Sequence, residues 1–217
     1  MNLISKAQIE PLFAEAGFRP YKGLLWYSCS GGLLRIIGFE KKTSDYSALY
    51  CIHPLFDYHD TLILTYGDDL LHRALRLHQS DYGDLILRKE MPSDEFDKHF
   101  SNVMRVFANE IIPFLKRIEN ADDLCDALER SKMFFAPAPA VLRLRAYCKL
   151  YAGHDSDSRK LFGAYADSLK NSVYKDTEAL LSEPNTLSLL MRTAPEEAHR
   201  LLQNNVERSM SCLHING

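Results

Sequence analysis

The chain has 217 residues, of which 46% are hydrophobic and 25% are charged, a balance that is ordinary for a folded globular protein. Its formal net charge is -3, so it lacks the basic excess with which nucleic-acid-binding proteins normally pair with phosphates. We therefore expect no nucleic-acid partner.

The first segment predicts a helix that ends at Gly17. Apolar residues between Ile4 and Ala16 fall on one broad face, and Ser5 with Gln8 has the spacing of a capping box. Pro11 would weaken the middle of this helix, because proline has no backbone N–H to donate.

The pattern then changes to that of β-strands. The runs LLWYSC and LLRIIGFEKK flank Gly31-Gly32 and predict a β-hairpin. ALYCIH is expected to form a third strand, TLILTY a fourth because its residues alternate, and LILRKE a last. A short helix is expected over 68–78. Together these elements predict an antiparallel sheet with the N-terminal helix packed on it.

From Pro92 onward the chain is predicted to be helical. Apolar residues from Phe96 to Ile118 recur at steps of three and four, the strongest helical pattern in the chain. Pro113 should kink or break that helix near Asn109. A short helix is expected over 120–130.

The proline-containing segment FFAPAPA, residues 134–140, predicts an extended linker. Beyond it we expect a helical hairpin over 141–151 and 156–173, with further helix starts at Glu183-Pro184 and at 193–196. The residues from Ser209 onward are expected to fray. The fold class is therefore α+β, with an α+β domain over 1–132 and a helical extension over 137–217.

The stretch HPLFDYHD, residues 53–60, holds two histidines and two aspartates and allows two interpretations. His53, Asp57, His59 and Asp60 offer imidazole and carboxylate ligands, as in a metal-dependent hydrolase. Alternatively, His53-Pro54 ends a strand and the rest is a polar loop. The stretch lies between two predicted strands, which favours the loop interpretation. Loops on a rigid sheet often hold the residues that recognise a binding partner.

A wider group of aspartates lies near the predicted strand ends. Its members are Asp57, Asp60, Asp68, Asp69, Asp81 and Asp84. If these ends converge, they form an anionic patch that would attract a basic partner. Aspartate is also common in turns for local reasons, because it hydrogen-bonds its own backbone.

The sequence contains no motif for phosphate binding or for a serine nucleophile. The glycines of SCSGGLLRIIG are not followed by Gly-Lys-Ser/Thr, and no G-x-S-x-G elbow is present. We expect no cofactor and no metal. The basic run RLRAYCK, residues 143–149, is interpreted as a solvated helix face. The five cysteines are scattered and predict reduced thiols, and no signal or membrane-spanning segment is recognised, so we expect a cytoplasmic protein.

Several segments together resemble a group of small bacterial proteins of unknown function. The resemblance rests on AEAGFRPYKGLLWYSC, with Gly17-Phe18 and Trp26-Tyr27, on LYCIHPLF, and on NEIIPFLKRIENADDLCDAL, and it covers residues 5–130. Proteins of this type are often encoded next to secreted polymorphic toxins. The resemblance implies an immunity protein and supplies no catalytic residue.

The sequence thus leads us to expect a non-enzymatic immunity protein that neutralises a cognate bacterial toxin by binding it and occluding its active site. The residues expected to contact the toxin are Asp57, Tyr58, His59, Asp60, Asp68 and Asp69. The alternatives are the metal-dependent hydrolase described above and a scaffold that binds through the helical hairpin after residue 137.

Overall fold

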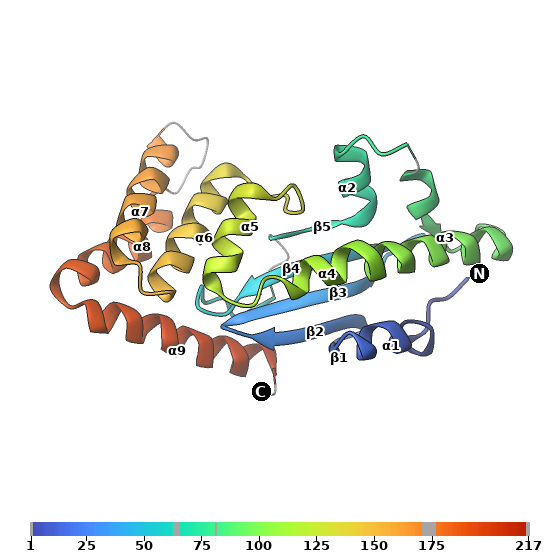
Figure 1. Cartoon of the computed structure of the whole chain (residues 1–217), viewed down its shortest axis with the longest axis horizontal. Helices are drawn as coiled ribbons and strands as arrows, with labels where there is room; N and C mark the ends of the chain where they lie inside the picture. Colours follow the sequence, from blue (N-terminus) through green and yellow to red (C-terminus); the bar gives the residue numbers. More distant parts are fainter. Residues whose placement is uncertain (1, 63–65, 81, 171–176, 216–217) are drawn as a thin grey trace.

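The computed structural model describes residues 2–62, 66–80, 82–170 and 177–215 (Figure 1). These residues form a six-stranded antiparallel sheet that is preceded by a helix and followed by a helical C-terminal region. The predicted α+β fold class is therefore confirmed. Along the described residues, no helix combines the length and the apolarity needed to cross a membrane.

The N-terminal helix, α1 (Lys6–Glu15), begins with the predicted capping box of Ser5 and Gln8. Gly17 adopts a φ of +87°, a left-handed conformation that ends the helix. Pro11 lies inside α1 without breaking it. Pro11 and Ala7, whose carbonyl loses its i+4 donor, both lie on the exposed side of the helix.

The sheet is a meander with its longest strands in the centre. Its strands are β1 (Arg19–Pro20), β2 (Leu24–Ser30), β3 (Leu33–Lys41), β4 (Asp45–Pro54), β5 (Gly67–Asp69) and β6 (Leu87–Arg88). They follow the order β1-β2-β3-β4-β5, and β6 pairs with the start of β4. Both faces of β3 and β4 are buried, as the long apolar runs require.

The fourth strand is shorter and later than the sequence predicted. Thr61 and Leu62 form no strand, and residues 63–65 lie outside the described residues. Pairing with β4 occurs instead at Gly67–Asp69. A Cβ atom on Gly67 would lie 2.0 Å from the carbonyl oxygen of Tyr50, so the close approach needs a glycine.

The chain leaves β5 directly into α2 (Leu70–Arg76) and returns through the 3₁₀ turn η1 (Tyr82–Leu85). One face of the sheet is then crossed by α3 (Ser93–Val106), the π-helical turn η2 (Phe107–Ile111) and α4 (Ile112–Lys116) (Figure 1). The irregularity predicted near Asn109 is this π-helical turn, which lies just before Pro113. Phe13 of α1 packs edge-on against Trp26 and Phe107 on the same face.

The C-terminal region consists of α5 (Ala121–Arg130), α6 (Ala138–Tyr151), α7 (Asp155–Lys170), α8 (Thr177–Thr193) and α9 (Pro195–Leu213). The helix start predicted at Pro184 is wrong, because Pro184 lies inside α8. The carbonyl of Leu180, which has lost its i+4 donor, accepts a hydrogen bond from the Tyr165 hydroxyl at 3.5 Å. The start predicted at Pro195 is confirmed.

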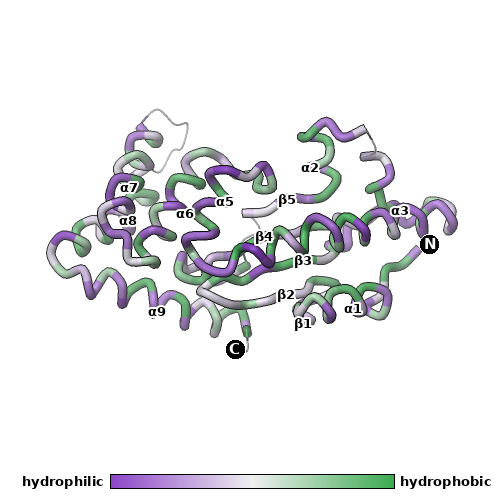
Figure 2. Tube along the Cα trace, in the orientation of Figure 1, coloured by the Kyte–Doolittle hydropathy of each residue, from purple (hydrophilic) through white to green (hydrophobic). Residues whose placement is uncertain are grey.

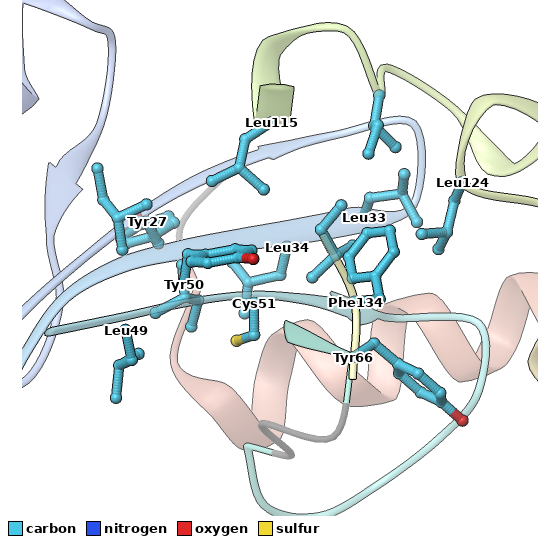
Figure 3. Close-up of a cluster of buried hydrophobic side chains, with 14 of the residues drawn as sticks. Tyr27, Leu33, Leu34, Leu49, Tyr50, Cys51, Tyr66, Leu115, Leu124 and Phe134 are labelled. Carbon is cyan, nitrogen blue, oxygen red and sulfur yellow. The ribbon is translucent and has the colours of Figure 1, made fainter. Parts of the chain in front are cut away.

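The helices after residue 137 pack against the end of the sheet where β4 ends (Figure 1). Their apolar side chains belong to the same hydrophobic core as those of the sheet. Figure 3 shows another part of that core, where Leu115 of α4 and Leu124 of α5 lie near Leu33 of the sheet. α9 alternates hydrophobic and hydrophilic stretches along its length, as expected of a helix with one buried face (Figure 2). The fraying predicted from Ser209 is wrong, because α9 continues to Leu213 and Ser209 is completely buried.

Candidate functional site

Asp57, in the loop that follows β4, is completely buried and binds Arg143 of α6. Two nitrogens of the Arg143 guanidinium donate to the two carboxylate oxygens, the Nη2–Oδ1 distance being 2.8 Å. Burial would raise the pKa of Asp57, but a hydrogen bond from His59 and the charge and hydrogen bonds of Arg143 lower it below its ordinary value. Asp57 is therefore an ionised partner in an internal ion pair.

Arg143 is also fixed from its other side. Its guanidinium lies over the Tyr147 ring, 4.6 Å from the centroid, and its Nη2 atom lies 3.5 Å from Glu183 of α8. Burial would lower the pKa of Arg143, but the charge of Asp57 raises it. Arg143, which does not share the helix face of Arg145 and Lys149, joins α6 to the loop after β4.

The backbone of the same loop is held by α9. Asn205 donates to the carbonyl oxygen of Phe56 at 3.1 Å, and Ser209 donates to that of Leu55 at 2.9 Å. Both side chains are buried, so these bonds satisfy carbonyl groups that are cut off from solvent. The Phe56 ring also stacks on Tyr151 of α6, with a centroid distance of 4.5 Å.

The other residues of this loop that were expected to contact a partner are less buried than Asp57. Tyr58 is half-buried, and the guanidinium of Arg208 lies 4.0 Å from its ring centroid. His59 is half-buried, with Nε2 3.6 Å from Asp57. Asp60 is exposed. The stretch HPLFDYHD is thus mainly a structural connection between the sheet, α6 and α9.

The metal interpretation of this stretch gains no support from the geometry. Within the part of the chain that the structure describes, no group of three or more His, Cys, Asp and Glu side chains is arranged to hold a metal ion. Both carboxylate oxygens of Asp57 are already bound by Arg143. His53 is completely buried.

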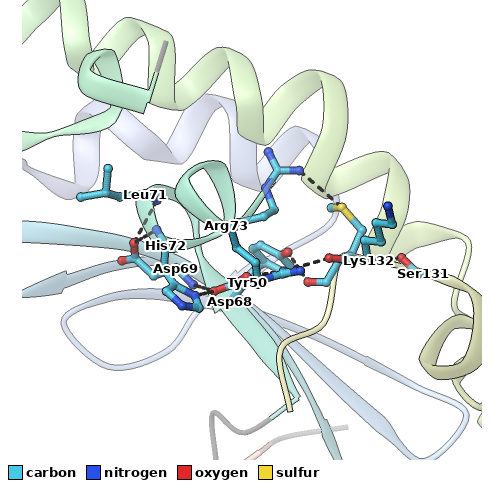
Figure 4. Close-up of polar contacts among 10 residues, drawn as sticks. Tyr50, Asp68, Asp69, Leu71, His72, Arg73, Ser131 and Lys132 are labelled. Carbon is cyan, nitrogen blue, oxygen red and sulfur yellow. Dashed lines mark hydrogen bonds and ion pairs between the residues drawn. The ribbon is translucent and has the colours of Figure 1, made fainter. Parts of the chain in front are cut away.

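Asp68 and Asp69, at the end of β5, also serve the fold (Figure 4). Asp68 is buried, and its two oxygens lie 2.6 Å from His72 and 2.6 Å from Arg76. Asp69 caps α2 by accepting hydrogen bonds from the backbone N–H groups of Leu71 and His72. Asp69 is half-buried, so it retains some exposure.

The described aspartates do not converge into one anionic patch, so the condition for that interpretation is not met. They are distributed along β4, because Asp57 follows its end at Pro54, Asp69 pairs with Leu49, and β6, just after Asp84, pairs with its start. At about 3.3 Å per residue, the ten residues of β4 separate the extremes by roughly 30 Å. Asp84 lies 3.9 Å from Lys98, and Asp81 lies outside the described residues.

An exposed apolar surface lies beside the α2 end of this region. Phe135 is 56% exposed and Leu75 is 46% exposed. The Phe135 ring packs edge-on against His72 at 4.7 Å, and the guanidinium of Arg76 lies 5.7 Å from its centroid. Leu71, His72, Leu75 and Phe135 together are referred to below as the α2 surface.

The backbone around Phe135 is fixed to the sheet rather than free. The N–H of Phe135 donates to the carbonyl oxygen of Gly67 at 3.1 Å and forms an antiparallel bridge with β5. Two residues earlier, the carbonyl of Met133 accepts from the Tyr50 hydroxyl, and Arg76 donates to the carbonyl of Lys132 at 2.9 Å (Figure 4). The extended backbone predicted over residues 134–140 is confirmed at Phe135, which adds to the edge of the sheet; it is wrong for residues 138–140, which form the first turn of α6 because proline is compatible with that position.

A groove of about 300 Å³ continues from the α2 surface along the edge of β4. Leu71, His72 and Leu75 form one wall, and Leu85 to Leu87 form the other. It opens where β4 passes from pairing with β5 to pairing with β6. A groove beside exposed apolar side chains is a typical setting for a protein contact.

Comparisons of this chain with family models, with curated proteins and with solved structures give no match. The site is therefore defined by its own geometry.

The sequence interpretation missed four residues that the structure makes important: Arg143, Asn205, Ser209 and Phe135. A signal for two of them exists, because Asn205 and Ser209 are spaced four apart on the apolar face of α9, where a polar residue needs an internal partner. No signal identifies Arg143, since its partner is 86 residues away.

Proposed function

We propose that this protein acts by binding another protein through the α2 surface, and that its partner is a bacterial toxin whose active site it covers. The observation that carries the proposal is the position of Phe135, which is 56% exposed although its backbone is bonded to β5. The aromatic ring is presented to solvent by a fixed support, so little conformational entropy is lost when a partner covers it.

The α2 surface contains residue types that are common at the centre of protein–protein interfaces. Aromatic residues and arginine dominate binding energies at protein interfaces, and here the Phe135 ring contacts His72 and Arg76, while the exposed Leu75 lies on the same helix. Arg76 is already paired with Asp68, so it can pack against a partner without being left as an unpaired charge.

This proposal changes the residues expected to contact the partner. Asp57 and Asp68 are buried and paired, so they cannot attract a basic partner as the sequence suggested. The 57–60 loop lies at the other end of β4, held between α6 and α9. Of the predicted contact residues, Asp69 lines the groove beside the α2 surface, and the buried Asp68 supports that surface from below through His72.

The identity of the partner as a toxin rests on the resemblance of residues 5–130 to immunity-type proteins. The proposed mode of action is steric occlusion, because Phe135 and the groove beside α2 offer an exposed surface that a partner protein can cover. We therefore carry forward the binding protein and not the hydrolase.

The test is co-expression with the protein encoded by the neighbouring gene, scored by cell survival and by sizing chromatography of the purified pair. Rescue of growth together with a co-eluting complex is the expected result. Rescue without a complex would contradict binding and would indicate enzymatic reversal of the damage. Absence of both toxicity and complex would contradict the toxin as partner.

The location of the interface is tested in the same assay with matched surface variants. Phe135→Ser should abolish or weaken rescue and co-elution. Leu189→Ser is the control, because Leu189 is also 54% exposed but belongs to α8. Equal behaviour of the two variants would contradict the α2 surface as the interface.

A further inference from the structure

A second concave site lies away from the α2 surface, between the loop after β4 and helices α6, α7 and α8. Its volume is about 340 Å³. The walls include Tyr66, Tyr165 and Leu180, and the polar groups that reach it are Arg143, Glu183 and His59. Binding sites for small molecules commonly combine such an apolar wall with a few convergent polar groups.

Among the described residues, Arg143 and Glu183 line this pocket and Asp57 lies behind Arg143, so their formal charges sum to one net negative charge. Arg143 is matched by Asp57, to which it is bound through two nitrogens. Glu183 approaches the same guanidinium only at 3.5 Å, and its side chain is 42% exposed. The second carboxylate is thus incompletely neutralised and accessible.

Two tyrosine hydroxyls, of Tyr66 in the pocket wall and of Tyr147 beside Arg143, add hydrogen-bonding capacity without charge. Burial raises the pKa values of the Tyr66 and Tyr147 hydroxyls, so both stay neutral. The Tyr147 hydroxyl lies 3.4 Å from Nη2 of Arg143, and the Tyr66 hydroxyl lies 3.5 Å from the carbonyl oxygen of Ala140. The Tyr147 hydroxyl is also hydrogen-bonded to Glu183, and Glu183, whose side chain is 42% exposed, is the charged acceptor that remains accessible at the pocket.

From this arrangement we infer that the α6–α8 pocket binds a small organic cation, whose charged group pairs with Glu183 and whose aromatic or aliphatic body lies against Tyr66, Tyr165 and Leu180. An anion is disfavoured there for two reasons. Arg143 is already occupied by Asp57, and an incoming carboxylate or phosphate would be repelled by Glu183.

The inference is tested on the full-length protein by isothermal titration with two probes of similar shape and opposite charge. Tryptamine is the cation and indole-3-propionate is the anion. Saturable binding of tryptamine, with binding of indole-3-propionate at least about tenfold weaker, is the expected result. Equal binding of the two probes, or no binding of tryptamine, would overturn the inference.

The role of Glu183 is tested with paired variants on α8. Glu183→Gln should weaken tryptamine binding about fivefold, whereas Glu178→Gln, an exposed change in the first turn of the same helix, should not. Unchanged binding by Glu183→Gln would contradict the assignment.

A second variant pair covers the case in which Glu183→Gln disturbs the fold. Leu180 is 39% exposed at the pocket, so Leu180→Lys adds a repelling charge without opening the core. This variant should lose tryptamine binding while its thermal midpoint stays unchanged. Leu189→Lys, outside the pocket on α8, should retain it, and equal binding by the two lysine variants would overturn the inference.

Discussion

Asp57 and Arg143, 86 residues apart in the chain, form a bidentate ion pair whose carboxylate is completely buried. This contact joins the loop after β4 to α6. The neighbouring backbone carbonyls of Leu55 and Phe56 are bound by Ser209 and Asn205 of α9. A loop that looks like a polar connection in the sequence is therefore a junction that secures the C-terminal helices to the sheet.

The ion pair should contribute strongly to stability. Asp57→Asn is expected to lower the free energy of unfolding by about 3 kcal/mol, because it leaves the largely buried guanidinium of Arg143 with only the more distant, half-exposed Glu183 as a counter-charge. Urea unfolding followed by circular dichroism measures the difference. Asp60→Asn, an exposed change in the same loop, should stay within about 0.5 kcal/mol of the wild type. Similar losses in the two variants would contradict the junction.

The same pair predicts a pH dependence. The pKa of Asp57 is lower in the folded protein than its ordinary value, since the contributions of His59 and Arg143 outweigh the effect of burial. Its stabilisation is therefore fully present above the unfolded-state pKa of about 4 and is lost as the pH falls through the folded-state pKa. The stability gap between wild type and Asp57→Asn should be constant from pH 7 to about 5 and narrow below about 4. A gap that remains unchanged at pH 3 would be inconsistent with this assignment.

Docking of α9 should depend on Ser209. Ser209→Ala leaves the buried carbonyl of Leu55 without its donor and should destabilise the protein by about 1–2 kcal/mol. Ser211→Ala is the matched control, because Ser211 is exposed on the same helix. Denaturant midpoints of the two variants measure the effect, and coincident midpoints would show that the bond is dispensable.

The turn between β2 and β3 provides a test of close packing. Gly31 and Gly23 have nearly the same φ, +58° and +59°, but only at Gly31 would a Cβ atom collide, lying 2.2 Å from the carbonyl oxygen of Glu119. Gly23→Ala should cost about 1 kcal/mol from backbone strain alone. Gly31→Ala should cost about 2 kcal/mol more, because the link between α4 and α5 must shift. Thermal unfolding of the pair measures this difference, and equal midpoints would refute the predicted contact.

Local signals predicted much of this fold. The capping box of Ser5 and Gln8, the Gly31-Gly32 turn and the helical spacing from Phe96 to Ile118 each depend on neighbours within a few residues. Such short-range patterns fix the helices and the hairpin. They also place the irregularity before Pro113, because a proline acts on its own turn of helix.

The candidate site could not be predicted in the same way. Whether Asp57 faces solvent or the core is decided by Arg143, and whether Asp68 is free is decided by the packing of α2 against β5. In the sequence, Phe135 is part of an apolar segment that was predicted to be a linker. Only the structure shows that its backbone pairs with Gly67 while its ring is exposed to solvent. Charge and exposure at these positions are tertiary properties.

The most direct test of the account is the affinity of the purified protein for the proposed partner, the protein encoded by the neighbouring gene, measured by titration calorimetry with wild type, Phe135→Ala and Leu189→Ala. We predict that Phe135→Ala weakens binding by about 2 kcal/mol, roughly thirtyfold, and that Leu189→Ala binds like the wild type. Unchanged affinity of Phe135→Ala, with the complex intact, would contradict the claim that the α2 surface is where this protein meets its partner.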